Sequence, residues 1–306
     1  MTDHEVLDDA AYARILQARL SEPRSLRRAL AERPRRALLP PDQRLVVLAA
    51  DHTARGMVAA DSDPLAAADR RGLLSRLLIG LENPLVDGVM ASADILEELA
   101  LLGALDHRLA IGTMNRGGII GAAWELDDRL TAYDADHVAE CGLDGGKMLL
   151  RLEMTDAGVA RTIELAARLT TALADQALMA MIEPLPYRKD DTGRAVLDTS
   201  EHGLVRAVGI ASGLGSSSAH TWLKIPATAN PALVAAATTC PILLLGGDAG
   251  AAWEAVFDRW RQALTVPNVR GLVPGRALLY PSTMTPREAV GRATDLVHGP
   301  QSEGAR

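Results

Sequence analysis

The sequence predicts a single (β/α)8 barrel behind a short helical cap, and three observations carry this prediction. Eight short apolar segments follow one another from residue 45 to residue 277, separated by longer stretches with helical spacing. The segments lack the polar alternation of a half-exposed sheet, as expected of parallel strands buried on both faces. Polar residues gather where the segments end, which is where such barrels place their active sites. The alternative is an open, doubly wound sheet with extra strands.

The composition excludes several classes of protein. Apolar residues make up 48% of the 306 positions and charged residues 23%, as in ordinary globular proteins. No apolar run is long enough to span a bilayer, and the acidic N-terminus does not resemble a secretory signal. A net charge of −7 disfavours a general nucleic-acid binder. We therefore expect a cytoplasmic protein without a membrane or nucleic-acid partner.

The first 44 residues are expected to form the cap. Helical spacing predicts one helix within residues 5–20 and a second from Pro23 to Ala31. The stretch 33–44 is rich in arginine and proline, so we interpret it as a solvated connector. Residues 45–306 are assigned to the barrel.

Eight strands and seven further helices follow in alternation. The predicted strands are 45–51, 86–92, 108–114, 145–153, 178–185, 220–227, 241–248 and 269–277. The predicted helices are 65–80, 93–105, 156–176, 201–212, 231–239, 251–264 and 286–297. Strands that alternate with helices in this way are typical of parallel βα units.

Lysine is the residue type that points most directly to chemistry. Only three of the 32 basic residues are lysines, namely Lys147, Lys189 and Lys224. Lys224 lies late in the sixth predicted strand, where alternation turns its side chain into the barrel. Burial disfavours the charged amine and lowers its pKa, which frees it to attack a carbonyl carbon and form a Schiff base. The alternative is a structural lysine that reaches the strand end and pairs with a carboxylate.

Three more polar residues sit on neighbouring strands. Lys147, on the fourth strand, can lower the pKa of Lys224 by repulsion, bind a substrate oxyanion, or form a structural ion pair. Glu183, at the end of the fifth strand, can move protons or balance the two lysines. Asp51 ends the first strand, where it can bind substrate hydroxyls, act in C–C cleavage, or only cap the next turn.

The last two strands suggest a phosphate site. The seventh ends at Gly246 and Gly247, and the eighth leads into Gly275 and Arg276. Barrels often bind phosphate in the loops after these strands, where glycines let the backbone approach closely. An arginine adds a charge-assisted contact.

These segments together resemble a known family. The pieces LAADHTARGM, GLDGGKMLLRLE, MIEPLPY, TWLKIPA, PILLLGGDA and GLVPGRALLYP are similar, in order and strand placement, to class I aldolases of the deoxyribose-phosphate/tagatose-bisphosphate aldolase superfamily. The resemblance covers about residues 45–281. It looks nearest to the tagatose-bisphosphate branch, with a lysine on strand four and a glutamate on strand five. Aldolases of the archaeal fructose-bisphosphate type look more distant, because their fifth strand favours a tyrosine.

The resemblance implies a function and roles. Lys224 would be the Schiff-base lysine, with Glu183, Lys147 and Asp51 as its polar neighbours, and Tyr187 would be an alternative proton shuttle to Glu183. The chain would be a lyase that cleaves a phosphorylated ketose or keto sugar acid to a triose phosphate, such as dihydroxyacetone phosphate, and an aldehyde. No cofactor and no metal are expected, the partner would be a small phosphorylated sugar, and we expect a homo-oligomer.

Two features leave part of this interpretation open. We include Arg55 among the substrate-binding residues. The segment between Asp51 and Arg55 is longer than in the tagatose-bisphosphate aldolase pattern. The loops 115–133 and 186–200 are long and leave the substrate undetermined. A non-catalytic barrel that binds a sugar phosphate, or a transferase that uses the same Schiff base, are the alternatives.

Overall fold

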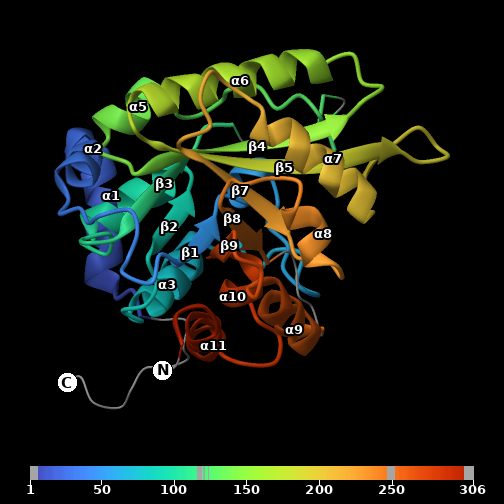
Figure 1. Ribbon diagram of the computed structural model, residues 1–306. Coiled ribbons are helices and arrows are strands. Elements are labelled where there is room, and N and C mark those ends of the chain that lie inside the picture. Colours follow the sequence, from blue (N-terminus) through green and yellow to red (C-terminus); the bar gives the residue numbers. More distant parts are fainter. Residues whose placement is uncertain (1–5, 116–118, 120, 123, 247–251, 300–306) are drawn as a thin grey trace.

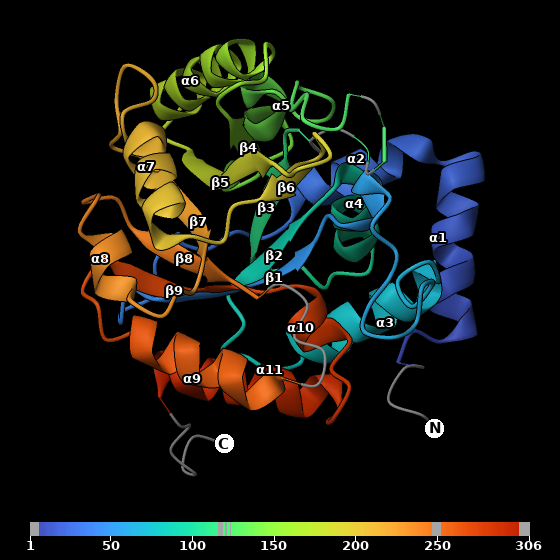
Figure 2. The same cartoon turned by 90° about the vertical axis from the view of Figure 1, so that its right-hand side faces the viewer.

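The computed structural model describes residues 6–115, 119, 121–122, 124–246 and 252–299, and its centre is a closed barrel of eight parallel strands (Figures 1 and 2). The strands are β1 (Leu45–Ala50), β2 (Gly88–Ala91), β3 (Leu109–Thr113), β4 (Gly145–Glu153), β5 (Met179–Lys189), β7 (Thr221–Pro226), β8 (Ile242–Leu245) and β9 (Val269–Val273). Each pairs with the next, and β9 returns to β1 through Leu45 opposite Gly271. The predicted barrel is confirmed, and the sheet is not open.

A hairpin extends one wall of the barrel. β5 continues past the predicted end at residue 185 and pairs antiparallel with β6 (Ala195–Leu197). The hairpin projects beyond the carboxyl ends of the barrel strands, at the right of Figure 1. Much of the long loop 186–200 is therefore an extension of the sheet above the barrel mouth.

Helices surround the barrel and precede it. They are α1 (Asp9–Ser21), α2 (Pro23–Glu32), η1 (Thr53–Arg55), α3 (Arg70–Leu81), α4 (Ala93–Leu101), α5 (Ala135–Glu140), α6 (Val159–Asp175), α7 (Glu201–Ser212), α8 (Pro231–Ala235), α9 (Trp253–Ala263), α10 (Arg276–Leu279) and α11 (Pro286–His298).

The predicted helices are present, and some of their ends differ. α3 begins five residues after the expected start at 65, because Asp69 caps it by accepting a hydrogen bond from the Arg71 N–H at 3.0 Å. The short elements η1, α5 and α10 were not predicted, since one or two turns carry too little periodicity. No helix of the described chain is long and apolar enough to cross a lipid bilayer.

The barrel interior is apolar from its amino-terminal end up to the layer of charged residues near its carboxyl end. Alternation along each strand sends one set of side chains inward and the other set outward onto the helices. The inward set is Leu45, Val47, Ala49, Met90, Leu109, Ile111, Met179, Met181, Trp222, Leu243 and Val273. The next inward positions towards the carboxyl ends of β1, β5 and β7 are polar, and they form the site described below.

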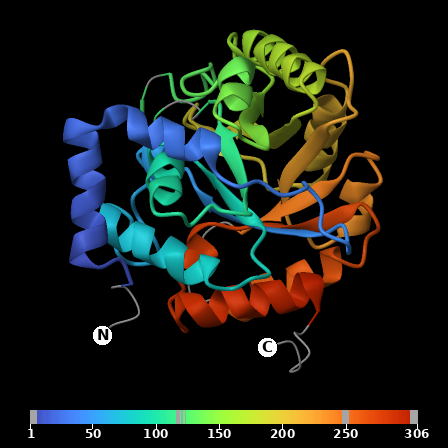
Figure 3. The ribbon, with the colours of Figure 1, turned by 90° about the vertical axis from the view of Figure 1, so that its left-hand side faces the viewer.

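The connector between α2 and β1 closes the amino-terminal end of the barrel. It runs across that end in Figure 3, and Leu38 packs against the apolar interior. The guanidinium of Arg33 is fully buried and pairs with Asp144 at 2.7 Å, while Arg36 pairs with Asp87 at 2.7 Å. Most of the connector is exposed, as predicted, but the side chains of these two arginines reach inward and neutralise carboxylates buried at the starts of β4 and β2.

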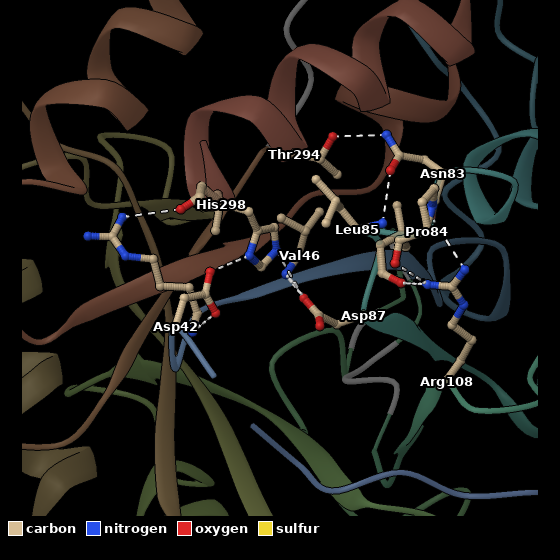
Figure 4. Close-up of polar contacts among 12 residues, drawn as sticks. Asp42, Val46, Asn83, Pro84, Leu85, Asp87, Arg108, Thr294 and His298 are labelled. Atoms are coloured by element: carbon tan, nitrogen blue, oxygen red, sulfur yellow. Dashed lines mark hydrogen bonds and ion pairs between the residues drawn. The ribbon is translucent and has the colours of Figure 1, made fainter. Parts of the chain in front are cut away.

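The last helix is fastened to the same end. His298, at the end of α11, lies between two carboxylates, with Nδ1 2.6 Å from Asp42 Oδ2 and Nε2 3.3 Å from Asp87 Oδ2 (Figure 4). Asp87 Oδ2 also accepts a hydrogen bond from the Val46 N–H at 2.7 Å. The carboxylate of Asp87 thereby ties α11, β1 and the connector together.

The cap helices pack against the barrel's outer helices. α2 lies on α4, and Arg19 of α1 pairs with the buried Glu98 of α4 at 2.6 Å. The division at residue 44 into a cap and a barrel stays a prediction.

Candidate active site

Four of the residues singled out from the sequence meet at the carboxyl end of the barrel. Asp51 follows Ala49 on the inward face of β1, Glu183 follows Met181 on β5, and Lys224 follows Trp222 on β7. Inward-facing side chains recur every two residues along each strand, and towards the carboxyl end they change from apolar to charged. Lys147 joins this layer from β4.

The charged groups are in direct contact. Lys147 Nζ lies 3.0 Å from Asp51 Oδ2 and 2.6 Å from Glu183 Oε2. Lys224 Nζ lies 3.3 Å from the same Glu183 oxygen. Thr113 Oγ1 donates to Asp51 Oδ2 at 3.2 Å. One lysine therefore has two close carboxylate partners, and the other shares a single oxygen at a longer distance.

The two lysines have opposite pKa shifts. Burial lowers the pKa of Lys224, the charge of Lys147 lowers it further, and Glu183 only partly opposes this. Burial also acts on Lys147, but the carboxylates of Asp51 and Glu183 outweigh it and raise the pKa of that amine. Lys224 is the group that loses its proton more easily, and Lys147 stays charged.

The carboxylates remain ionised in this setting. Burial alone would raise the pKa of Glu183, but the positive charges of Lys147 and Lys224 hold it at about 2. The same two lysines hold the pKa of Asp51 far below its usual range despite its burial. Both groups are thus hydrogen-bond acceptors before a substrate binds.

A cavity of about 270 Å³ opens over Lys224 and Glu183. Gly246, Gly275 and Arg276, which the sequence suggests as phosphate-binding residues, line it. A side chain at Gly275 would place its Cβ 2.4 Å from the His52 imidazole and 2.6 Å from the Ala49 carbonyl oxygen, so only glycine fits there. Gly247 lies outside the described residues.

Three further residues line the same cavity. Arg55 at the end of η1 lies here, and so does Tyr187 of β5. His52, which the sequence allows as either a substrate contact or an ordinary loop histidine, also lines the cavity. Burial lowers the pKa of its imidazole to about 4, and the charges of Lys224 and Arg276 add to that, so His52 is neutral at pH 7.

Sequence reasoning missed the polar network above β4. Arg151 and Asp128 form a fully buried ion pair, 2.7 Å between Nη2 and Oδ1. Arg151 also donates to the Glu125 carbonyl oxygen, and Asn115 donates to the Asp128 carbonyl oxygen at 2.6 Å. These contacts fix the segment 124–128 beside the cavity, which Glu125 lines. The only signal was the unusual length of the loop 115–133.

No group of three or more His, Cys, Asp or Glu side chains within the described residues is arranged to hold a metal ion.

The chain matches one protein family over most of its length. The model of the Cgl0159-like family matches residues 43–294. A crystal structure of Cgl0159 from Corynebacterium glutamicum is 40% identical, covers 96% of this chain and 98% of that one, and superposes with a TM-score of 0.92. No match was found among curated proteins.

More distant structures share the fold. An archaeal fructose-1,6-bisphosphate aldolase, whose catalytic Lys is covalently bound to the carbinolamine intermediate of its substrate, is 19% identical with a TM-score of 0.62 and covers 90% of this chain and 100% of that one. A fructose-bisphosphate aldolase from Slackia heliotrinireducens is 13% identical, also with a TM-score of 0.62, and covers 100% of this chain and 98% of that one. That the chain resembles the tagatose-bisphosphate aldolases more than the archaeal fructose-bisphosphate aldolases stays a prediction.

Proposed function

The chain belongs to the Cgl0159-like family, and from the geometry of its barrel mouth we propose that it is a Schiff-base aldolase, a lyase without a metal cofactor. The observation that carries the proposal is the unequal sharing of Glu183 between two buried lysines. Lys147 holds its proton, and Lys224 is left as the available amine at the cavity. An aldolase of this kind needs such a nucleophile near a proton acceptor.

The reaction would proceed through covalent steps on Lys224. Its neutral amine attacks the ketone carbon of the substrate, and loss of water from the carbinolamine gives an iminium ion. The C–C bond then breaks, and its electron pair moves into the iminium to form an enamine. The hydroxyl on the carbon that leaves gives up its proton and becomes the aldehyde oxygen. Protonation and hydrolysis of the enamine release the second product and regenerate the amine.

Glu183 is placed to move these protons. Its Oε2 lies 3.3 Å from Lys224 Nζ, within reach of a carbinolamine formed there, and Lys147 holds it as a carboxylate. Tyr187 lines the same cavity and is the alternative shuttle. Asp51 is fixed by Lys147 and Thr113, which suits an acceptor for a substrate hydroxyl.

The substrate would be a phosphorylated ketose or keto sugar acid. Gly246, Gly275 and Arg276 suit a phosphate at the β8 and β9 side of the cavity, and Arg55 adds a cation near it. Cleavage would then leave a triose phosphate such as dihydroxyacetone phosphate on Lys224 and release an aldehyde. An archaeal aldolase with this fold holds a carbinolamine intermediate on its catalytic Lys, which supports a covalent step on Lys224.

Borohydride reduction tests this function. Incubation with dihydroxyacetone phosphate and borohydride should add one triose phosphate to the chain, and peptide mapping should find it on the peptide that contains Lys224. A chelator should not reduce the labelling. A label on Lys147 or Lys189, or no label under conditions in which the protein is folded, would contradict the proposal.

A further inference from the structure

A second cavity lies outside the barrel and is larger than the one at Lys224. This outer cavity has a volume of about 580 Å³ and lies between residues 121–122 and 124–127, the loop that leads into α6, and the β5–β6 hairpin. Its wall includes Glu125, which also lines the cavity at Lys224, so the two spaces adjoin at this residue. Ligand-binding cavities typically measure about 300–1,000 Å³, so the outer cavity has room for a ligand body of its own.

Three cations face the outer cavity from different elements. They are Arg161 on α6, Lys189 on β5 and Arg194 in the turn of the hairpin. The carboxylate paired with Lys189 is Glu153, at 3.9 Å. Within the described part of the chain, neither Arg161 nor Arg194 forms an ion pair. Cations that are brought together without direct carboxylate partners can bind an anionic ligand.

The acids in the same wall already have partners. Asp127 accepts from Arg129 Nε at 2.9 Å, and Asp156 accepts from the Gly158 N–H at 2.7 Å. Glu125 accepts from the Gly121 N–H at 2.9 Å. These carboxylates accept hydrogen bonds within their own loops. Among the described residues, the guanidinium groups of Arg161 and Arg194 form no hydrogen bond, although the charge of Arg161 also lowers the pKa of Asp127.

An aromatic surface completes the outer cavity. The indole of Trp124 lines it and is 55% exposed, which is unusual for the largest apolar side chain. An exposed indole offers a flat apolar face against which a ligand body can pack. Trp124, Arg161 and Arg194 together fit a molecule with an apolar or planar body and an anionic end.

The strand order relates the outer cavity to the phosphate site. The phosphate residues follow β8 and β9, whereas the outer cavity is built on the loops after β3, β4 and β5. In the barrel β4 and β9 are separated by three strands in either direction, so these sites lie on opposite sides of the mouth, with Lys224 of β7 inside it. A substrate held by its phosphate near Arg276 would direct its other end towards the outer cavity.

We propose that the outer cavity binds a carboxylate or phosphate carried on the aldehyde half of the substrate, beyond the carbon chain that is cleaved. This inference rests on the proposed aldolase function for its link to Lys224. Glu125 stands where the two cavities meet, and the chain of the substrate passes beside it. Arg161 and Arg194 bind the anionic group, and Trp124 packs against the body that carries it.

Direct binding tests the outer cavity without any covalent step. Phenyl phosphate, benzoate and benzyl alcohol are titrated calorimetrically into the wild type and the double variant Arg161→Ala/Arg194→Ala. The anionic probes should bind the wild type more tightly than benzyl alcohol does, and the double variant should lose at least tenfold in affinity for them. Arg168→Ala, which removes an exposed arginine of α6 outside the cavity, is the matched control and should bind as the wild type does. Equal affinity in the double variant, or no preference for the anions, overturns the proposal.

Turnover tests the link to the substrate. Condensation of dihydroxyacetone phosphate with 4-carboxybenzaldehyde should be faster than with benzaldehyde, and the double variant should reduce that preference at least tenfold while borohydride labelling of Lys224 is unchanged. Labelling with an unchanged preference shows that the aldehyde half does not use the outer cavity, which overturns the proposal. If the wild type is not labelled at all, the aldolase function fails and takes the substrate link with it, while calorimetry separately decides whether the cavity binds anions.

Discussion

The two ends of the barrel bury charged groups in different ways. At the amino-terminal end, arginines from the connector pair with Asp87 and Asp144, whose remaining lone pairs bind backbone N–H groups. At the carboxyl end, Lys147 pairs with Asp51 and shares the carboxylate of Glu183 with Lys224. A guanidinium stays protonated wherever it is buried, whereas an ammonium can give up its proton. The first arrangement suits stability, and the second leaves one amine available for chemistry.

The largest effect expected is on the carboxyl end. Lys224→Arg keeps the charge but replaces a nucleophilic amine with a guanidinium, so aldol cleavage should fall by several orders of magnitude, as when other covalent nucleophiles are removed. Lys147→Arg should be milder, because that residue supplies charge. Steady-state kinetics on both variants measure the contrast, and equal losses would show that the two lysines do not have separate roles.

Substitutions at the amino-terminal end of the barrel should lower the free energy of unfolding. Arg33→Ala leaves the buried Asp144 with only the partly exposed Arg35 as its cationic partner, and breaking a buried ion pair costs about 3–5 kcal/mol. Denaturant unfolding should show this loss. Arg27→Ala, which breaks an exposed pair with Glu140, serves as the control and should leave the unfolding midpoint unchanged. A similar small effect in both variants would refute the view that the connector arginines stabilise the barrel end.

A smaller effect is expected at the phosphate site. Arg276→Ala removes a cation that the substrate meets in both its ground state and its transition state, so KM should rise by about tenfold or more, with little change in kcat. The comparison of a phosphorylated with an unphosphorylated ketose measures it. A KM that stays constant for the phosphorylated substrate argues against the site.

The smallest effect is a pH dependence of stability at the amino-terminal end. Burial alone would lower the pKa of His298, but the carboxylates of Asp87 and Asp42 outweigh it and raise it. The folded protein therefore holds this proton more tightly than the unfolded chain. The stabilisation is complete below the ordinary histidine pKa of about 6.5 and is lost as the pH rises through the folded value. Unfolding curves of wild type and His298→Gln should differ more at pH 5.5 than at pH 9, and a constant difference would contradict the assignment.

Sequence patterns predicted the parts of the molecule that depend on local periodicity. The apolar runs located all eight barrel strands, and alternation along β7 correctly turned Lys224 into the barrel. The role of the connector was not predictable in this way. Arg33 and Asp144 are 111 residues apart, and the sequence around Arg33 does not indicate that it pairs with a buried carboxylate.

The surroundings of the site were harder to predict for the same reason. The pairing of Arg151 with Asp128 and the position of Glu125 depend on how a long loop folds back over β4. The two lysines illustrate the same limit. The sequence predicted that both lie on barrel strands, but only their distances to Glu183, 2.6 Å for Lys147 and 3.3 Å for Lys224, distinguish the charged amine from the available one.

In the proposed mechanism Lys147 keeps its proton so that Lys224 can lose its own, and the pH dependence of borohydride labelling reveals which lysine is neutral. In the wild type, labelling of Lys224 by dihydroxyacetone phosphate should reach half its maximum below the ordinary lysine pKa of about 10.4, because burial and the charge of Lys147 lower the pKa of Lys224. Lys147→Met removes that charge, so the pKa of Lys224 should rise and the midpoint should move to higher pH. A midpoint that stays in place or moves to lower pH in Lys147→Met would contradict the account.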